Sequence, residues 1–195
     1  SIQNAPEQIE SYERLAWILN RRMDRPSDAD KTIDELVEAN PDSFQAYLAR
    51  WRYRKATPRN SNIDEIGQDV LRAMELAPDD VEVLLEAAEL AAAKGNLDEA
   101  LDILQRGIQL NLKDARLYVG LSKIELLQGN KETALRFLEQ GLAETGDNAD
   151  LIWLRANLLI DLNKVEDARN LIDRLRTTAS DDSLVSFLDS RLLMK

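Results

Sequence analysis

The chain has 195 residues, a net charge of −11 and neither cysteine nor histidine. These absences exclude disulfide bonds, a cysteine nucleophile, a histidine general base and metal sites built on thiolate or imidazole ligands. The 36 acidic residues outnumber the 25 basic ones, which opposes binding to a phosphate backbone, and no acid-free apolar stretch of about 18 residues predicts a membrane span.

Hydrophobic periodicity and capping signals predict eleven helices and no strand. The expected helices lie at about 9–23, 28–40, 43–56, 63–77, 80–94, 97–111, 114–128, 131–145, 149–162, 165–178 and 182–194. Asp42, Asn62 and Asp79 are the expected N-caps of three of these helices. Gly95 and Asn163 each follow a helix at the position where a left-handed residue ends it at low cost.

Two sequence registers repeat with one period. A segment that begins with glycine or asparagine and has alanine as its sixth residue occurs at 95–101, 129–135 and 163–169, an interval of 34 residues each time. A second series, of mostly small residues, marks the preceding helix at intervals of 34 to 37 residues: Ala16, Trp51, Ala88, Ser122, Ala156 and Ser190. The two registers predict a repeat protein built from helix pairs. Gly107 and Gly141, inside second helices, are expected where a neighbouring helix approaches closely.

The repeat resembles the tetratricopeptide repeat family, whose unit is a 34-residue helix–turn–helix. The matching positions are the small residues of the first helices, the turn glycines, the second-helix alanines and the closing prolines: Ala16, Ala88, Ser122, Ala156, Gly95, Gly129, Ala29, Ala100, Ala134, Ala168, Pro41 and Pro78. Trp51 departs from the pattern, because a small residue is usual at its position. The resemblance implies an all-α fold, a right-handed α-solenoid of antiparallel helix pairs with about five units and one extra C-terminal helix.

The resemblance also implies a domain organisation. Residues 1–8 are an N-terminal extension, and a single solenoid domain covers 9–195. Its units are expected at approximately 9–43, 44–80, 81–114, 115–148 and 149–182, with a partial unit at 183–195. In the partial unit the apolar residues spread around the helix instead of forming one stripe, so it looks like the first half of a sixth repeat. Its exposed apolar edge is expected to be covered by further chain or by a second copy, as in a homodimer through the C-terminal helix.

For function, the resemblance implies a non-catalytic protein–protein interaction scaffold. Members of the family usually hold a peptide or a partner surface in a concave groove lined by the first helix of each unit. On that pattern the groove candidates are Arg52, Lys55, Glu86, Glu89, Arg116, Lys123, Trp153 and Asn157. Plain solvated surface is the alternative for each of them. The clamp with which some members grip chaperone C-termini is not assembled, because the third unit contributes only acids.

One run of the chain, residues 50–55, is locally basic and interleaves arginine and lysine with Trp51 and Tyr53, and Arg59 lies just beyond it. Residues 63–89 then hold nine acids and a single base. Three hypotheses fit this pattern: the neighbouring repeats neutralise each other with Trp51 in the core, an anionic peptide binds, or a nucleic acid stacks on the aromatic rings. The net negative charge opposes the third hypothesis.

The acidic clusters predict no catalytic site. They fall at predicted helix starts, where carboxylates cap backbone N–H groups, and none of them fits a calcium-binding loop. A glycine-rich phosphate loop is also missing from the sequence. The sequence therefore predicts no enzyme activity, no catalytic residue, no metal ligand and no cofactor.

Other function classes stay open beside the scaffold. One is self-assembly, another is an accessory region of a larger enzyme or of a secretion or envelope protein, and a third is helical-repeat RNA binding. The expected partner is a protein or peptide and not a nucleic acid. The start without methionine suggests a piece of a longer, bacterial-type protein, in the cytoplasm or the periplasm, with no targeting signal in this segment.

Overall fold

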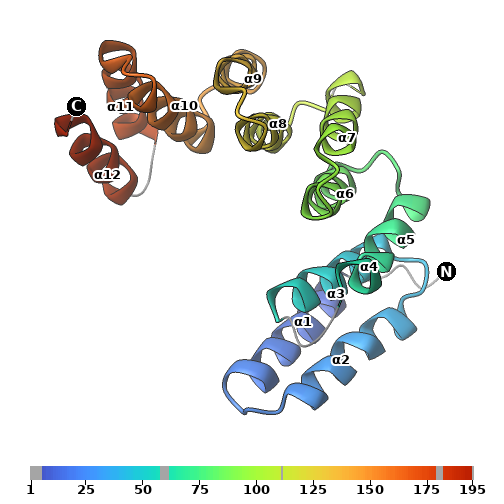
Figure 1. Ribbon diagram of the computed structural model, residues 1–195. Coiled ribbons are helices and arrows are strands. Elements are labelled where there is room, and N and C mark those ends of the chain that lie inside the picture. The colour runs from blue at the N-terminus through green and yellow to red at the C-terminus, as the bar shows by residue number, and fades with distance from the viewer. Residues whose placement is uncertain (1–5, 58–61, 111, 179–181, 195) are drawn as a thin grey trace. The chain divides into compact units, whose positions relative to one another are not determined.

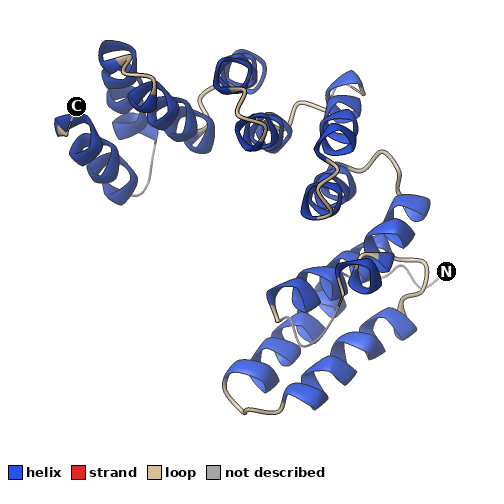
Figure 2. Ribbon diagram, in the orientation of Figure 1, coloured by secondary structure: helices blue, strands red, loops and turns tan. Residues whose placement is uncertain are grey.

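The structure, a computed structural model, describes residues 6–57, 62–110, 112–178 and 182–194 (Figure 1). All regular secondary structure in these ranges is helical (Figure 2), which confirms the predicted all-α fold class. The twelve helices of the described residues are α1 (Pro6–Arg21), α2 (Pro26–Ala39), α3 (Phe44–Ala56), α4 (Ile63–Ile66), α5 (Gln68–Leu76), α6 (Val81–Ala93), α7 (Leu97–Gln109), α8 (Ala115–Leu127), α9 (Lys131–Thr145), α10 (Ala149–Asp161), α11 (Val165–Thr178) and α12 (Asp182–Leu193). None of these described helices combines the length and apolarity that a bilayer span requires.

The chain divides into two compact units, residues 1–96 and residues 97–195. In the first unit, α1 packs against α2, α3 packs against α5, and α3 also contacts the neighbouring first helices α1 and α6. In the second unit, α8 packs against α9, α10 packs against α11, and α10 also contacts α8 and α12. Helix hairpins therefore stack in chain order within each unit, because one hairpin cannot bury its apolar stripe alone. The single domain over 9–195 and its repeat boundaries stay predictions.

The turns between paired helices share one backbone structure. α6, α8 and α10 are each followed by a residue with positive φ, namely Gly95 (84°), Gly129 (84°) and Asn163 (59°). At the first turn, the N–H groups of Gly95 and Asn96 donate to carbonyl oxygens of the last turn of α6 at 3.0 and 2.9 Å. This arrangement is a Schellman motif, which satisfies carbonyls that a helix C-terminus leaves open. The left-handed positions predicted at Gly95 and Asn163 are confirmed.

One predicted helix is interrupted. The expected helix at 63–77 forms α4 and α5, which meet at Gly67, so the prediction of eleven helices is wrong by one. A Cβ atom at Gly67 would lie 2.8 Å from the carbonyl oxygen of Ile63 and 2.8 Å from Leu90 Cδ1. The first helix of the next repeat, α6, thus packs directly on the bare backbone at this point.

Two of the three predicted N-caps are wrong by one residue. Asn62 caps α4 as predicted, since its side-chain oxygen accepts a hydrogen bond from the backbone N–H of Asp64 at 3.1 Å. The cap of α6 is Asp80 and not Asp79, because only the residue directly before the first turn places its carboxylate within reach of the second and third N–H groups. The residue before α3 is Ser43, not Asp42.

The core is formed by the positions that the repeat register marks. The small first-helix residues and the second-helix alanines that match the repeat pattern are all buried: Ala16, Ala88, Ser122, Ala156, Ala29, Ala100, Ala134 and Ala168. Trp51, which departs from the pattern, is also fully buried. The core can hold this ring because its one polar atom, Nε1, donates to Glu86 of the next repeat at 2.7 Å.

The C-terminal helix α12 does not bury a single apolar stripe. Val185 and Leu188 are buried against the second unit's core. Phe187, Leu193 and Met194 are 51%, 89% and 76% exposed. The predicted spread of apolar residues around this helix is therefore confirmed over the described residues 182–194.

The close approach predicted at Gly141 gives the first testable prediction. A Cβ atom at Gly141 would lie 2.7 Å from Tyr118 Cβ and 3.0 Å from Leu151 Cδ1. Gly141→Ala should therefore lower the midpoint temperature of thermal unfolding, with a cost of about 1–3 kcal/mol for overpacking, although alanine favours a helix.

Gly120→Ala is the matched control for Gly141→Ala. The atoms nearest to a Cβ added at Gly120 belong to the end of the Leu104 side chain, with Cδ1 at 2.9 Å, and that flexible chain can rotate away. The cost of Gly120→Ala should therefore be the smaller of the two, as measured by circular dichroism on heating. Equal costs would contradict the rigid contact at Tyr118.

Candidate functional site

The first helices of the first unit carry their polar side chains in stripes. On α6, Glu82, Glu86 and Glu89 are spaced by four and three residues, which places them on one face of the helix. On α3, Arg52 and Lys55 are spaced by three residues, and α3 contacts α6. Two stripes of opposite charge therefore meet between successive repeats.

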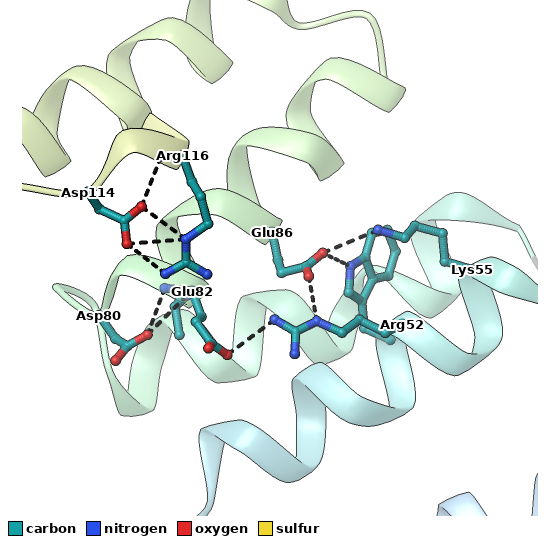
Figure 3. Close-up of polar contacts among 9 residues, drawn as sticks. Arg52, Lys55, Asp80, Glu82, Glu86, Asp114 and Arg116 are labelled. Carbon is teal, nitrogen blue, oxygen red and sulfur yellow. Dashed lines mark hydrogen bonds and ion pairs between the residues drawn. The ribbon is translucent and has the colours of Figure 1, made fainter. Parts of the chain in front are cut away.

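Glu86 is the centre of this contact. Its carboxylate accepts hydrogen bonds from Arg52 Nε at 2.6 Å, from Trp51 Nε1 at 2.7 Å and from Lys55 Nζ at 3.3 Å. Figure 3 shows the Arg52 and Lys55 side chains converging on Glu86. The same two bases reach the neighbouring acids, at 3.2 Å to Glu82 and 2.7 Å to Glu89. Four of the predicted groove candidates, Arg52, Lys55, Glu86 and Glu89, are thus brought together by pairing with one another.

The charges of this network stabilise one another. Although burial alone would raise the pKa of Glu86, the hydrogen bonds from Arg52 and Trp51 and the charge of Lys55 lower it below its ordinary value. The pKa of Arg52 is raised, because its bonds to Glu86 and Glu82 outweigh the effect of burial. Lys55 Nζ also lies 5.2 Å from the centre of the Trp51 ring, a cation–π contact.

The remaining bases of the 50–55 run point to the other side of α3. Arg50 forms a bidentate ion pair with the buried carboxylate of Asp69, with Nε and Nη2 at 2.9 and 2.6 Å from its oxygens. Arg50 and Arg54 both donate to Asp34, at 3.1 and 2.6 Å. Each base of the run is therefore paired with carboxylates of the helices next to it, as the neutralisation hypothesis predicted. Arg59 lies outside the described residues.

In the second unit the basic candidates behave differently. Arg116 binds Asp114, two residues away, with Nη2 at 2.7 Å and Nε at 2.9 Å from its oxygens (Figure 3). Asp114 is also the N-cap of α8, and the hydrogen bonds from Arg116 lower its pKa. Lys123, further along α8, is exposed and makes no ion pair with any described residue. Arg116 is thus held by its own helix start, whereas Lys123 extends into solvent.

Trp153 and Asn157 lie on α10, on the side that packs against α12. The Trp153 ring packs against Phe187 of α12, with ring centres 6.0 Å apart. Asn157 accepts a hydrogen bond from Arg191 of α12, which also binds Asp161. The indole Nε1 of Trp153 is buried and has no hydrogen-bond partner among the described residues. Asn157 is therefore engaged by the next helix, while Trp153 keeps an unused donor.

Sequence reasoning missed several members of these contacts. Phe187 and Arg191 were assigned no role at the groove, and no residue of α1 was proposed for it. A signal was available for one of them, because Arg191 follows Asn157 by 34 residues, just as Glu86 follows Arg52 and Glu89 follows Lys55. Within the described residues, no group of three or more acidic side chains is placed to hold a metal ion.

Stacked helix hairpins whose first helices share a polar face define an α-helical repeat protein. The family model described as tetratricopeptide repeat matches residues 68–124 and 125–188, which is more than half of the chain. The chain belongs to the tetratricopeptide repeat family. Family membership supports a general role as a protein-interaction scaffold, and proteins of this family are typically non-catalytic.

Solved structures of tetratricopeptide repeat proteins share this fold. A thermophilic tetratricopeptide repeat protein of Thermus thermophilus superposes with a TM-score of 0.72 at 19% identity, over 95% of this chain and 99% of its own. A tetratricopeptide repeat protein of Parabacteroides merdae gives a TM-score of 0.70 at 20% identity, over 95% of this chain and 71% of its own. PilF of Pseudomonas aeruginosa gives 0.69 at 18% identity, over 95% and 83%. No curated protein sequence matches the chain.

The Glu86 network gives the second testable prediction. Glu86→Gln should lower the thermal stability at neutral pH by on the order of 1–2 kcal/mol, because Arg52 and Lys55 lose the carboxylate that they share. The pKa of Glu86 is lowered in the folded chain, so this stabilisation is present above the ordinary value of 4.5 and is lost as the pH falls through the folded value. The midpoint temperatures of wild type and variant should therefore converge in acid.

Glu89→Gln is the matched control for Glu86→Gln. It removes the same charge from the same helix face, but Glu89 is more exposed and bonds only to Lys55 among the described residues. Its cost should stay below about 1 kcal/mol. A difference between wild type and Glu86→Gln that persists unchanged in acid would show that the carboxylate charge is not the cause.

Proposed function

We propose that the chain is a non-catalytic scaffold that holds a protein or peptide partner on the faces formed by the first helices of its repeats. The observation that carries this proposal is the environment of the Trp153 side chain. Its Nε1 donor is buried without an acceptor among the described residues, and its ring lies beside Phe187, which is half exposed. A buried donor normally has a partner, and aromatic side chains dominate the energetics of protein interfaces.

The candidates are expected to differ in what they contribute to binding. Lys123 is exposed and pairs with no described residue, and the partly exposed Trp153 ring offers apolar surface beside Phe187. Arg52, Lys55, Glu86 and Glu89 already pair with one another, and Arg116 pairs with Asp114. Such pre-paired groups fix orientation and specificity more than they add affinity.

The third testable prediction concerns Trp153. A partner would be identified by capture from the native lysate with mass spectrometry, and its binding would then be measured with purified chains. Trp153→Ala should weaken that binding about tenfold or more while helicity stays nearly unchanged, because truncating an aromatic anchor removes a large part of the interface energy. Binding of the partner to the wild type should also change the tryptophan fluorescence.

Leu71→Ala is the control for Trp153→Ala. It removes an exposed apolar side chain from α5, a second helix of the first unit, and should leave binding of the same partner unchanged. A loss of helicity that parallels the loss of binding in Trp153→Ala would show that Trp153 is only a core residue.

Self-assembly through α12 is the second candidate function, and the exposed side chains of Phe187, Leu193 and Met194 favour it.

The fourth testable prediction follows from these exposed side chains. If α12 joins two copies, light scattering should show a mass that rises with concentration, and Leu193→Glu should abolish the rise, because a charge would enter an apolar contact. A mass that stays at 22.1 kDa at all concentrations would exclude this function.

A further inference from the structure

A pocket of about 270 Å³ opens between the three first helices of the first unit. Ile9, Glu10 and Glu13 of α1 line it on one side, Ala49 and Arg52 of α3 on another, and Glu82 of α6 on a third. Its volume lies just below the roughly 300–1,000 Å³ typical of pockets that enclose a whole small molecule. The space therefore suits one side chain of a larger partner.

The charges that line the pocket are unbalanced. Three carboxylates face one guanidinium, and that guanidinium is already bonded to Glu86 at 2.6 Å and to Glu82 at 3.2 Å. Glu10 and Glu13 make no hydrogen bond or ion pair with any described residue. The pocket therefore has two carboxylates that form no ion pair, three residues apart on the same face of α1.

The other wall of the pocket is apolar. Ile9 and Ala49 line it with hydrocarbon side chains, and 8% and 3% of these residues are exposed. A hydrocarbon wall next to carboxylates matches a side chain that has an aliphatic stem and a cationic head. An acidic side chain would meet three carboxylates and a single arginine whose charge is already paired with Glu82 and Glu86.

We propose that this pocket receives the cationic side chain of a lysine or arginine from the protein partner, with the head group between Glu10 and Glu13 and the stem against Ile9 and Ala49. This inference rests on the proposed function, and it gives the partner a chemistry: a basic residue in the segment that crosses α1, α3 and α6. The net charge of −11 favours the approach of such a segment.

The pKa of Glu13 is raised by burial and by the nearby charges of Glu10 and Glu82, against the opposing effect of Arg52. A cation placed in the pocket would stabilise the Glu13 carboxylate and reverse this shift. Binding should accordingly weaken in acid, and the weakening should begin above the ordinary carboxyl pKa of 4.5.

The test uses capped tripeptides as probes and the full chain labelled with nitrogen-15. Ala-Lys-Ala at millimolar concentration should shift the backbone amide signals around residues 9–13 and 45–52. Ala-norleucine-Ala, which keeps the stem without the charge, and Ala-Glu-Ala should not shift them. Glu13→Gln should weaken the lysine probe about fivefold or more, as expected for the loss of one partly buried charge pair.

Two further variants sharpen the result. Glu13→Lys should abolish binding of the probe, because the new ammonium group would occupy the pocket from within the chain. Glu38→Gln removes the same charge from an exposed site on α2 and should leave binding unchanged. Dispersed amide spectra of all variants would establish that they are folded.

The proposal is overturned if the lysine and norleucine probes shift the same signals equally, if Ala-Glu-Ala binds instead, or if Glu13→Gln and Glu38→Gln behave alike. Failure of this test leaves the scaffold function standing, because that function is measured separately by the effect of Trp153→Ala on the captured partner. Failure of the Trp153 test leaves the tripeptide result unaffected in the same way.

Discussion

A helix hairpin of this chain can bury its apolar face only against the next hairpin, and the other features of the structure follow from that dependence. It requires small or bare positions where helices cross, such as Ala88, Gly67 and Gly141. It also brings side chains of successive repeats within bonding distance, as it does for Arg52 and Glu86. Packing and polar pairing are both contacts between neighbouring repeats.

The charges of the first unit show how this dependence limits function. The basic run at 50–55 looks like a binding surface in the sequence, yet its four bases bond to carboxylates of adjacent helices in the structure. Since the bases are used between repeats, the acids that remain unpaired, Glu10 and Glu13, set the character of the pocket beside them. The pocket is therefore lined mainly by acids, although the run at 50–55 beside it is the most basic part of the sequence.

The second unit offers a different kind of surface. Its first helices carry aromatic side chains and an unused donor, at Trp153 and Phe187, in place of a charge network. Polar side chains link α10 to α12 through Asn157 and Arg191, so residues that are proposed for binding also hold the stack together. A binding experiment at these positions therefore needs a measurement of helicity.

The sequence by itself determined the class of fold, the repeat period, the left-handed turns at Gly95 and Asn163, and the burial of the small residues, because these features depend on local propensity and on a pattern that recurs along the chain. It also identified Arg52, Lys55, Glu86 and Glu89 as residues of one face. Only the tertiary structure decided that these four pair with one another and that Trp51 donates to Glu86. The pocket between α1, α3 and α6 could not be predicted from the sequence either. Its walls come from three helices, and their spacing depends on how the hairpins pack and not on any single segment of sequence.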